Sequence, residues 1–307
     1  MLRRNVLILH SGALGDFVLT WPLILALGRT QPQSRIIAVT QASKGKLAEA
    51  ALRVESADIE SGWQGLFIEA SNPTGAAEKL ARAAKEIYSF ISEAGDVATM
   101  NLTRWSNGAD VIPIPPRPPA DCKLHAAEYI AEQVKDRPVT GVGVRQMLAS
   151  ISDRGLGFGG SSGDVVVHPG SGSETKNWPR PRFLELAKKL RAGGRTVRLI
   201  VGEVEQEKWA QGEIAAFSDV AQVRTPASYV ELFEEYKSAG LVIANDSGPG
   251  HLAGVMGIPT LSLFGPTDPN VWRPLGPRVK ILHREKLDQL AVQDVYDAAV
   301  GMQKGVT

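Results

Sequence analysis

Short apolar runs alternate along the chain with longer stretches of amphipathic, helical periodicity. Uninterrupted apolar runs predict buried strands, and recurrence every three to four residues predicts helices. Strands are predicted at 5–9, 35–40, 66–69, 96–100, 111–114, 164–168, 196–201, 241–244, 259–264 and 278–282. Helices are predicted at 17–27, 44–53, 73–91, 124–134, 182–192, 205–217, 227–238 and 287–300. This alternation is typical of mostly parallel sheets with right-handed crossovers, so we expect an α/β fold.

Two of these helices carry more specific predictions. The first is expected to end at Gly28, because glycine is favoured just past a helix C-terminus. Residues 73–91 are expected to form one long amphipathic helix, since apolar residues such as Leu80 and Ile87 recur there at helical spacing.

The composition changes between residues 136 and 163, a segment that contains seven glycines and shows little helical periodicity. We interpret 136–163 as a peripheral segment that leads into an interdomain linker. A length of 307 residues suits two α/β domains of about 150 residues each, or one large domain. We place the domains at 1–160 and 161–307, and the C-terminal helix, at about 287–300, is a candidate to pack back onto the first.

Composition narrows the class of protein. A net charge of +1 does not favour nucleic acid as a partner. The single cysteine, Cys122, excludes an intramolecular disulfide and suits a reducing compartment. His10 and Asp16 interrupt the first apolar run, which we therefore interpret as a strand rather than a signal peptide. Because no apolar run reaches transmembrane length, we expect a cytoplasmic protein whose membrane contact is at most peripheral.

The stretch with the most chemistry is the turn Asn245–His251, which follows the apolar strand at 241–244 and precedes a short helix. A strand, a glycine-rich turn and a helix in this order aim backbone N–H groups at an anion. We therefore expect Ser247, Gly248 and His251 to hold the diphosphate of a nucleotide sugar.

Two further polar residues belong to this candidate site. Asp246 cannot favourably contact a bare phosphate, so it is expected to orient the turn or to meet substrate hydroxyls. Thr267, in a second turn at 265–268, is an additional donor. The alternative is an ordinary turn between a strand and a helix, in which Asp246 or Ser247 only caps the helix.

A second loop, at residues 169–181, combines small hydroxyl residues with one cation. Gly170 allows a ligand to approach the backbone, and Ser171 offers a hydroxyl group. Lys176 supplies a point charge suited to phosphate. The alternative is a solvated loop whose lysine binds nothing.

A third loop follows the first predicted strand and ends in a carboxylate. Ser11, Gly12 and Gly15 are its candidate substrate-binding residues. Asp16 is a candidate general base that takes a proton from an attacking hydroxyl. The alternative is that Asp16 only caps the helix that follows.

Acidic residues also follow the strand at 196–201. Glu203 and Glu205 stand where a carboxylate can accept hydrogen bonds from a ribose diol. The alternative is an acid that is favoured at a helix start by the helix dipole.

Three motifs, taken together, resemble those of the ADP-heptose:lipopolysaccharide heptosyltransferases of glycosyltransferase family 9. They are His10-Ser-Gly-Ala-Leu-Gly-Asp16, His168-Pro-Gly-Ser-Gly with Lys176-Asn-Trp-Pro, and Asn245-Asp-Ser-Gly-Pro-Gly-His251 with Phe264-Gly-Pro-Thr-Asp-Pro. The resemblance implies a GT-B fold, in which two Rossmann-like domains with parallel sheets face each other across a cleft. The N-terminal domain would bind the acceptor, and the C-terminal domain would bind the nucleotide sugar.

The resemblance also implies a reaction. It is the inverting, metal-independent and cofactor-free transfer of a heptose from an ADP-sugar to a lipopolysaccharide-core or other lipid-linked cell-envelope glycan. Asp16 resembles the catalytic base and Lys176 the phosphate-binding lysine, and Glu205 rather than Glu203 resembles the ribose-binding acid. Such an enzyme would act on the cytoplasmic face of the inner membrane. The alternatives are a GT-B transferase with another nucleotide sugar and a nucleotide-sugar-binding module without activity.

Overall fold

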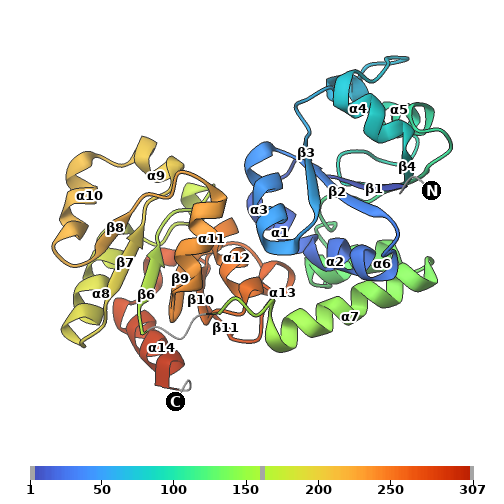
Figure 1. Ribbon diagram of the computed structural model, residues 1–307. Coiled ribbons are helices and arrows are strands. Elements are labelled where there is room, and N and C mark those ends of the chain that lie inside the picture. Colours follow the sequence, from blue (N-terminus) through green and yellow to red (C-terminus); the bar gives the residue numbers. More distant parts are fainter. Residues whose placement is uncertain (1–3, 160–162, 305–307) are drawn as a thin grey trace. The chain divides into compact units, whose positions relative to one another are not determined.

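The computed structural model describes residues 4–159 and 163–304, apart from the side chains of Glu203, Val204, Gln211 and Lys304. The chain divides into two compact units, Met1–Leu148 and Ala149–Thr307 (Figure 1). Each unit is an open sheet of parallel strands that is covered by helices. The predicted α/β class with two Rossmann-like units is therefore confirmed.

In the first unit the strands lie in the order β3-β2-β1-β4-β5. β1 is central, and its Leu7 pairs with Ile37 of β2 on one side and with Ile87 of β4 on the other. The chain first builds one half of the sheet and then the other, so a topological switch point lies between β1 and β4. The strands are β1 (Asn5–Leu9), β2 (Arg35–Thr40), β3 (Glu55–Asp58), β4 (Ala84–Ser89) and β5 (Asp110–Pro113).

β1 is buried along its whole length because helices cover this sheet. On one face, Leu7 and Leu9 belong to a core that contains Trp63, Leu102 and Trp105. The helices are α1 (Leu14–Leu19), α2 (Trp21–Thr30), α3 (Ala42–Leu52), α4 (Gly75–Arg82), α5 (Val97–Trp105) and α6 (Ala126–Gln133), with the 3₁₀ turn η1 at Gln64–Phe67. The helix α7 (Pro138–Arg154) begins in this unit and ends in the second.

In the second unit the strands lie in the order β11-β10-β9-β6-β7-β8, which is the order of dinucleotide-binding sheets when it is counted from β6. Its switch point lies between β6 and β9, where Val167 pairs with Ile243. The strands are β6 (Val165–His168), β7 (Val197–Ile200), β8 (Gln222–Arg224), β9 (Leu241–Asn245), β10 (Thr260–Phe264) and β11 (Val279–His283).

Helices also bury both faces of this second sheet. Val165 and Val167 point into a core with Leu186 and Val295, whereas Val166 between them is equally buried on the opposite face. The helices are α8 (Arg180–Ala192), α9 (Glu203–Lys208), α10 (Gln211–Ser218), α11 (Tyr229–Lys237), α12 (Gly248–Met256), α13 (Pro269–Trp272) and α14 (Val292–Lys304), with 3₁₀ turns η2 (Glu174–Lys176) and η3 (Leu287–Gln289).

Three elements of the first unit differ from the prediction. The expected long helix at 73–91 is α4 followed by the strand β4, because Ile87 is needed beside Leu7 in the sheet. The expected strand at 66–69 is absent, and its first two residues, Leu66 and Phe67, belong to the turn η1. The expected strand at 96–100 is instead the start of α5, whose cap is the Asp96 carboxylate accepting a hydrogen bond from the Thr99 N–H.

The glycine-bearing segment at 136–163 also differs from the prediction. Most of it is the helix α7, which packs closely on α2, since a methyl group on Gly143 would lie 3.0 Å from Thr30 Cγ2. Beyond α7, the N–H groups of Leu156 and Phe158 donate to the carbonyls of Val255 and Met256. These residues are therefore packed within the second unit and do not form a free linker.

Two expectations concern the limits of the domains. The predicted boundary between residues 160 and 161 lies outside the described residues, and the units divide earlier, after Leu148. The C-terminal helix was a candidate to pack onto the first domain. In the structure its buried residues, among them Val295 and Ala299, belong to the core of the second unit, with α8.

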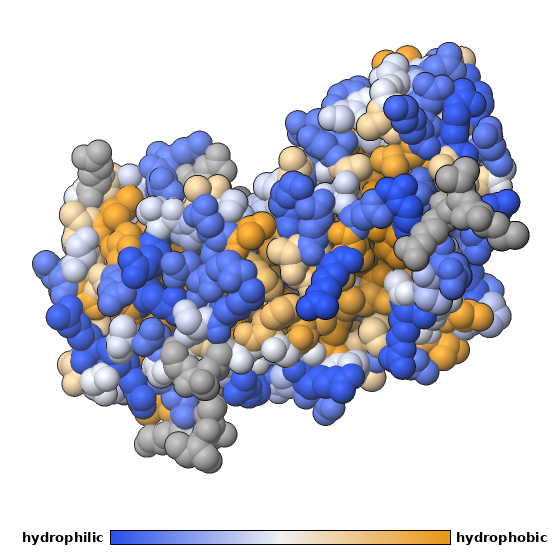
Figure 2. Space-filling model, viewed as in Figure 1, coloured by the Kyte–Doolittle hydropathy of each residue, from blue (hydrophilic) through white to orange (hydrophobic). Residues whose placement is uncertain are grey.

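Within residues 4–159 and 163–304, no helix combines the length and apolar character that crossing a bilayer requires. Figure 2 shows hydrophilic residues spread over the visible face of each unit, with apolar residues exposed between them, as on most proteins.

A substitution at Gly28 tests whether the helix α2 ends there, as predicted, or continues past it, as observed. The structure places Gly28 inside the helix with open space around its Cα, so Gly28→Ala should raise the free energy of unfolding by about 0.5–1 kcal/mol. Urea denaturation measures this change. If Gly28 instead ended the helix in a left-handed conformation, the same substitution would destabilise the protein.

Gly257 provides the matched comparison for that experiment. It ends α12 with a φ of 88°, a left-handed conformation in which alanine is strained. Gly257→Ala should therefore lower the free energy of unfolding by about 1–2 kcal/mol.

Candidate active site

In the second unit, the predicted site residues gather at the carboxyl ends of neighbouring strands. The loop 169–177 follows β6, and the turn Asp246–His251 follows β9, which is the strand next to β6. Thr267 follows β10, and Glu205 follows β7. The switch point of an open α/β sheet is where such folds bind ligands. The structure therefore brings these residues to the expected edge of the sheet.

A single buried side chain, Asn245, joins the two central loops. Its amide nitrogen donates to the Pro169 carbonyl at 2.6 Å and to Asn177 Oδ1 at 3.2 Å. Its Oδ1 accepts a hydrogen bond from the backbone N–H of Trp178 at 3.1 Å. Asn245 is fully buried. The loop after β6 is thus fixed to the end of β9 on both sides of Lys176.

Lys176, Asp246 and Thr267 meet at one carboxylate oxygen. Lys176 Nζ lies 2.7 Å from Asp246 Oδ2, and Thr267 Oγ1 donates to the same oxygen at 2.5 Å. The Lys176 side chain is 30% exposed, whereas that of Asp246 is only 5% exposed. Asp246 therefore orients a cation whose side chain is still partly exposed. Of its two expected roles, this contact fits orientation of the turn.

The helix α12 follows its N-cap residue Ser247, and its first turn carries backbone N–H donors that the helix does not use. The first N–H groups of a helix have no partner within it, which here concerns Gly248 and Gly250, since Pro249 has no N–H. The Ser247 side chain does not cap the helix, and its hydroxyl is buried without a hydrogen-bond partner among the described residues. Ser247 therefore occupies the N-cap position of α12, but its side chain makes no capping hydrogen bond. The positive end of the helix dipole points in the same direction as these donors.

Two other predicted residues, His251 and Ser171, are also buried in this region. His251 lies in the first turn of α12 and is 5% exposed. Ser171 Oγ donates to the Ser173 carbonyl at 2.7 Å and accepts from the Ser173 N–H at 3.3 Å. The Ser171 hydroxyl therefore shapes its own loop in this structure.

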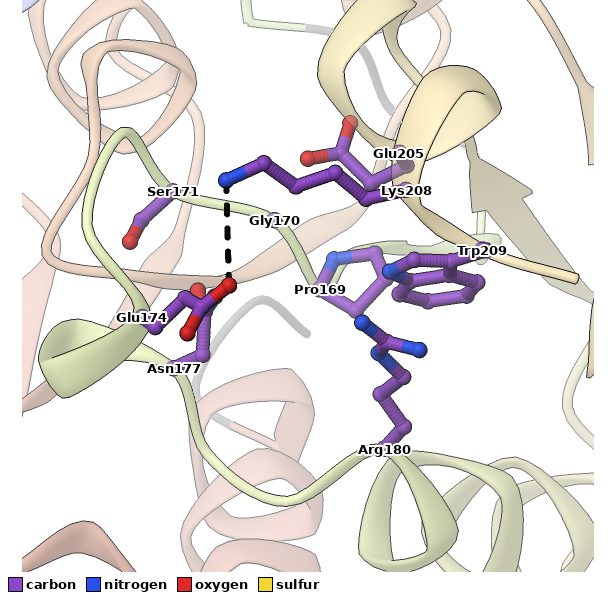
Figure 3. A pocket seen from close by; sticks show the side chains of 9 residues that line it. All are labelled: Pro169, Gly170, Ser171, Glu174, Asn177, Arg180, Glu205, Lys208 and Trp209. Atoms are coloured by element: carbon purple, nitrogen blue, oxygen red, sulfur yellow. Dashed lines mark ion pairs between the residues drawn. The ribbon is translucent and has the colours of Figure 1, made fainter.

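A small pocket lies beside the loop after β6 (Figure 3), with about 350 Å³ of empty space that includes its open mouth. Glu205 stands at its inner side, where its Oε2 accepts a hydrogen bond from the Gly202 N–H at 2.8 Å. A methyl group on Gly170 would lie 1.6 Å from Glu205 Oε1, so only glycine fits at position 170. The side chain of Glu203, the other candidate acid, lies outside the described residues.

Two cations line this pocket, Lys208 and Arg180, and each is paired with a carboxylate. Lys208 Nζ lies 3.9 Å from Glu174 Oε1, and this ion pair crosses the mouth in Figure 3. The Arg180 guanidinium lies 4.9 Å from the centre of the Trp209 ring and donates to both carboxylate oxygens of Glu213 at 2.8 Å. Sequence reasoning did not single out Arg180, Lys208 or Trp209, because nothing in their local pattern marks a ligand.

In the first unit, Asp16 lies in the first turn of α1 at the carboxyl end of β1. Its side chain is 17% exposed, and Arg117 Nη2 lies 3.6 Å from its Oδ2. The N-cap of α1 is Ala13, so the alternative that Asp16 is the N-cap is wrong. The preceding loop is tied to β2's end, because Gln41 Nε2 donates to the Ser11 carbonyl at 3.0 Å.

Gly12 and Gly15 complete this loop. Gly15 is buried in α1. A methyl group on Gly12 would lie 2.9 Å from His10 Cε1 and 3.3 Å from Asp16 Oδ2, so glycine lets both side chains pack against the backbone. Burial lowers the pKa of His10 to about 3, which keeps this imidazole neutral.

Sequence reasoning missed Lys44, which lies behind the same loop. Lys44 Nζ donates to the Gly12 carbonyl, and the residue is 5% exposed. The signal that could have found it was its position just after the strand at 35–40, which neighbours the first strand in this type of sheet. Among residues 4–159 and 163–304, no three His, Cys, Asp or Glu side chains gather as a metal site.

The environment of Glu205 leads to a pH-dependent prediction. Burial raises the pKa of Glu205 above its ordinary value, against the opposing charges of Lys208 and Arg180. The folded state therefore holds this proton more tightly than the unfolded state, and stability decreases as pH rises through and above 4.5, the ordinary pKa. Glu205→Gln should unfold at higher urea concentration than wild type at pH 7.

This gain from Glu205→Gln should vanish below about pH 4.5, where Glu205 is protonated in both states. Glu207→Gln, on the exposed side of the same helix, is the matched control and should change stability little at either pH. A Glu205→Gln variant that is equally or less stable than wild type at pH 7 would contradict the assigned cost of burying the carboxylate.

Comparison with known proteins places the sequence in a family. The family model for glycosyltransferase family 9 (heptosyltransferase) matches residues 126–299. A lipopolysaccharide heptosyltransferase 1 from Pseudomonas aeruginosa is 38% identical over 105 residues, which is 34% of this chain and 29% of that protein. A lipopolysaccharide heptosyltransferase 3 from Escherichia coli is 34% identical over 113 residues, 36% of this chain and 33% of that protein. The matched regions thus span about a third of the length of these relatives.

Solved structures resemble the chain over almost its whole length. E. coli heptosyltransferase WaaC with ADP has a TM-score of 0.70 at 18% identity and covers 97% of this chain and 99% of its own. A family 9 glycosyltransferase from Veillonella parvula has a TM-score of 0.72 at 17% identity, covering 98% of this chain and 97% of its own. At this identity the likeness shows the GT-B fold alone. Since the family model matches more than half of the sequence, the chain belongs to glycosyltransferase family 9, the heptosyltransferase family.

Proposed function

We propose that this protein transfers a heptose from ADP-heptose to a lipopolysaccharide-core or related lipid-linked acceptor, with inversion and without a metal. The observation that carries the proposal is the convergence of Lys176, the Ser247 hydroxyl and the N-terminus of α12 at the switch point of the second unit. Membership of family 9 supports the reaction class, and the structurally similar E. coli heptosyltransferase WaaC has been solved with ADP.

The second unit would hold the donor. A diphosphate gains from the Lys176 cation, from the unused donors of α12 and from the dipole of that helix. These groups stabilise the charge that develops on departing ADP. The half-buried pocket beside them offers the Glu205 carboxylate as an acceptor for the hydroxyls of a ribose.

The first unit would hold the acceptor and the base. In the proposed step, the acceptor oxygen attacks the anomeric carbon while its proton passes to an Asp16 carboxylate oxygen. The bond from that carbon to the phosphate oxygen breaks, and ADP leaves with the electron pair. A single displacement inverts the configuration at the anomeric carbon. It requires the acceptor on the first unit to reach the donor on the second, at the cytoplasmic face of the inner membrane.

Donor choice is tested by nucleotide binding and turnover. ADP should raise the melting temperature more than UDP or GDP at equal concentration, and the wild type should release ADP from ADP-heptose when a core acceptor is present. Asp16→Asn should lower kcat by about 10²- to 10⁴-fold, the usual contribution of a general base, while ADP still binds.

The outcomes of this test separate the alternatives. Selective stabilisation by UDP or GDP would show that the donor carries another nucleotide. Binding of ADP without turnover on any core acceptor would favour a binding module without activity. Full activity of Asp16→Asn would show that Asp16 is not the base.

Removing Lys176 alone would leave the buried Asp246 carboxylate without its cation, so Lys176 is tested in the Asp246→Asn variant. Asp246→Asn is the reference, and Asp246→Asn with Lys176→Met is expected to bind ADP about ten- to a hundredfold more weakly, because a hydrogen bond to a charged group contributes about 1.5–3 kcal/mol. Calorimetry measures both affinities. Lys188→Met, on the exposed side of α8, is the control for charge alone. Equal ADP affinity in the single and double variants would exclude Lys176 as a phosphate ligand.

A further inference from the structure

Lys44 is a buried lysine in an unfavourable place. It lies in the first turn of α3, at the positive end of the helix dipole, and it is only 5% exposed. Lysine is almost never buried to this extent unless it is paired. The partner of its ammonium group is the carbonyl of Gly12, in the loop that leads to Asp16.

Gly12 connects this lysine to the carboxylate. Lys44 Nζ contacts the Gly12 carbonyl, and Asp16 Oδ2 lies against the Gly12 Cα, where a methyl group would be 3.3 Å away. The Gly12 residue is thus contacted by both side chains. Lys44 thus constrains the carbonyl of Gly12, in the loop that leads to Asp16.

Two cations accompany Asp16, and they differ in freedom. Arg117 lies 3.6 Å from Asp16 Oδ2, but its side chain is 71% exposed, so an incoming acceptor can displace it. Lys44 is enclosed and has no such freedom. His10, another titratable residue near Lys44, stays neutral because burial and the charge of Lys44 lower its pKa to about 3.

We propose that Lys44 is a positioning residue, which fixes the loop through the Gly12 carbonyl and supplies an enclosed counter-charge that keeps the Asp16 carboxylate oriented toward the acceptor. This inference rests on the proposed role of Asp16 as the base. A fixed cation in a poorly hydrated place acts more strongly than an exposed one, which water and salt screen.

The charge of Lys44 is itself sensitive to pH. Burial lowers its pKa to about 8, while the carboxylate of Asp16 acts in the opposite direction. Above this pH the ammonium loses its proton, and Asp16 then loses its interior counter-charge. Heptosyl transfer should therefore decline on the alkaline side with a midpoint near pH 8.

Kinetics over a range of pH test the role. Lys44→Met should lower kcat about tenfold, a part of what a general base contributes, and should remove the alkaline decline. Its KM for ADP-heptose should stay within about twofold of wild type, because the proposed donor site lies on other residues. Lys44→Arg should restore part of kcat and move the decline to higher pH, since arginine keeps its charge.

Lys46→Met is the matched control for the kinetic test. Lys46 lies on the same helix, its side chain is 68% exposed, and it pairs with Glu49, so its loss should leave kcat and the pH profile unchanged. Wild-type kcat with a retained alkaline decline in Lys44→Met would overturn the proposal. Equal loss of activity in Lys46→Met would show a general effect of charge and would overturn it as well.

A titration that needs no activity gives an independent answer. The side-chain NMR signal of Lys44, assigned by its loss in Lys44→Arg, should titrate near pH 8 in the wild type. In Asp16→Asn the midpoint should fall, because the neighbouring negative charge is gone. An unchanged midpoint would overturn the proposal, and this measurement stands even if Lys44→Met does not fold.

The two proposals fail in different ways. If Asp16→Asn retains transfer, the proposed base is wrong, whatever the titration of Lys44 shows. If Asp16→Asn loses transfer while Lys44→Met keeps the wild-type pH profile, the base stands and only the role of Lys44 falls.

Discussion

The candidate donor site depends on one buried amide. Asn245 gives hydrogen bonds to the loop before Lys176 and receives one from the backbone just after it. A carboxylate at this position could not donate to the Pro169 carbonyl, and an aliphatic residue would leave buried backbone groups unpaired. The two loops at the switch point are therefore one structural unit. The position of the lysine, and with it the charge that a diphosphate would meet, follows from this connection.

The two units use their cations in related ways. Lys176 in the second unit is oriented by the buried carboxylate of Asp246, and Lys44 in the first is held by the carbonyl of Gly12. In the second unit the carboxylate is the more deeply buried partner, whereas in the first unit the lysine itself is buried. Exposed pairs such as that of Lys46 with Glu49 contribute little, because both groups remain hydrated. Lys176 and Lys44 thus differ from surface lysines in the contacts that hold their charges in place.

The structural features that depend on neighbouring residues in the sequence were predicted best. The turn Asn245–His251 was recognisable because a strand, glycines and a helix follow one another within a few residues. The helix α7 was missed because Gly143 resembles a loop residue, whereas its real reason is close packing on α2. The strand β4 was predicted as a helix, since the spacing of Ile87 fits either structure until its neighbour in the sheet is known. Lys44 was missed for the same reason, because its role depends on Gly12, far from it in sequence.

The contact between Gly170 and Glu205 has a consequence for how this chain can change over generations. No side chain can be accepted at position 170 while the Glu205 carboxylate occupies the space beside it. A shorter residue at 205 would remove that obstacle, but a larger residue at 170 would then block any return to glutamate. The two positions can therefore diverge in only one order, and once the second has changed, the first step can no longer be reversed alone.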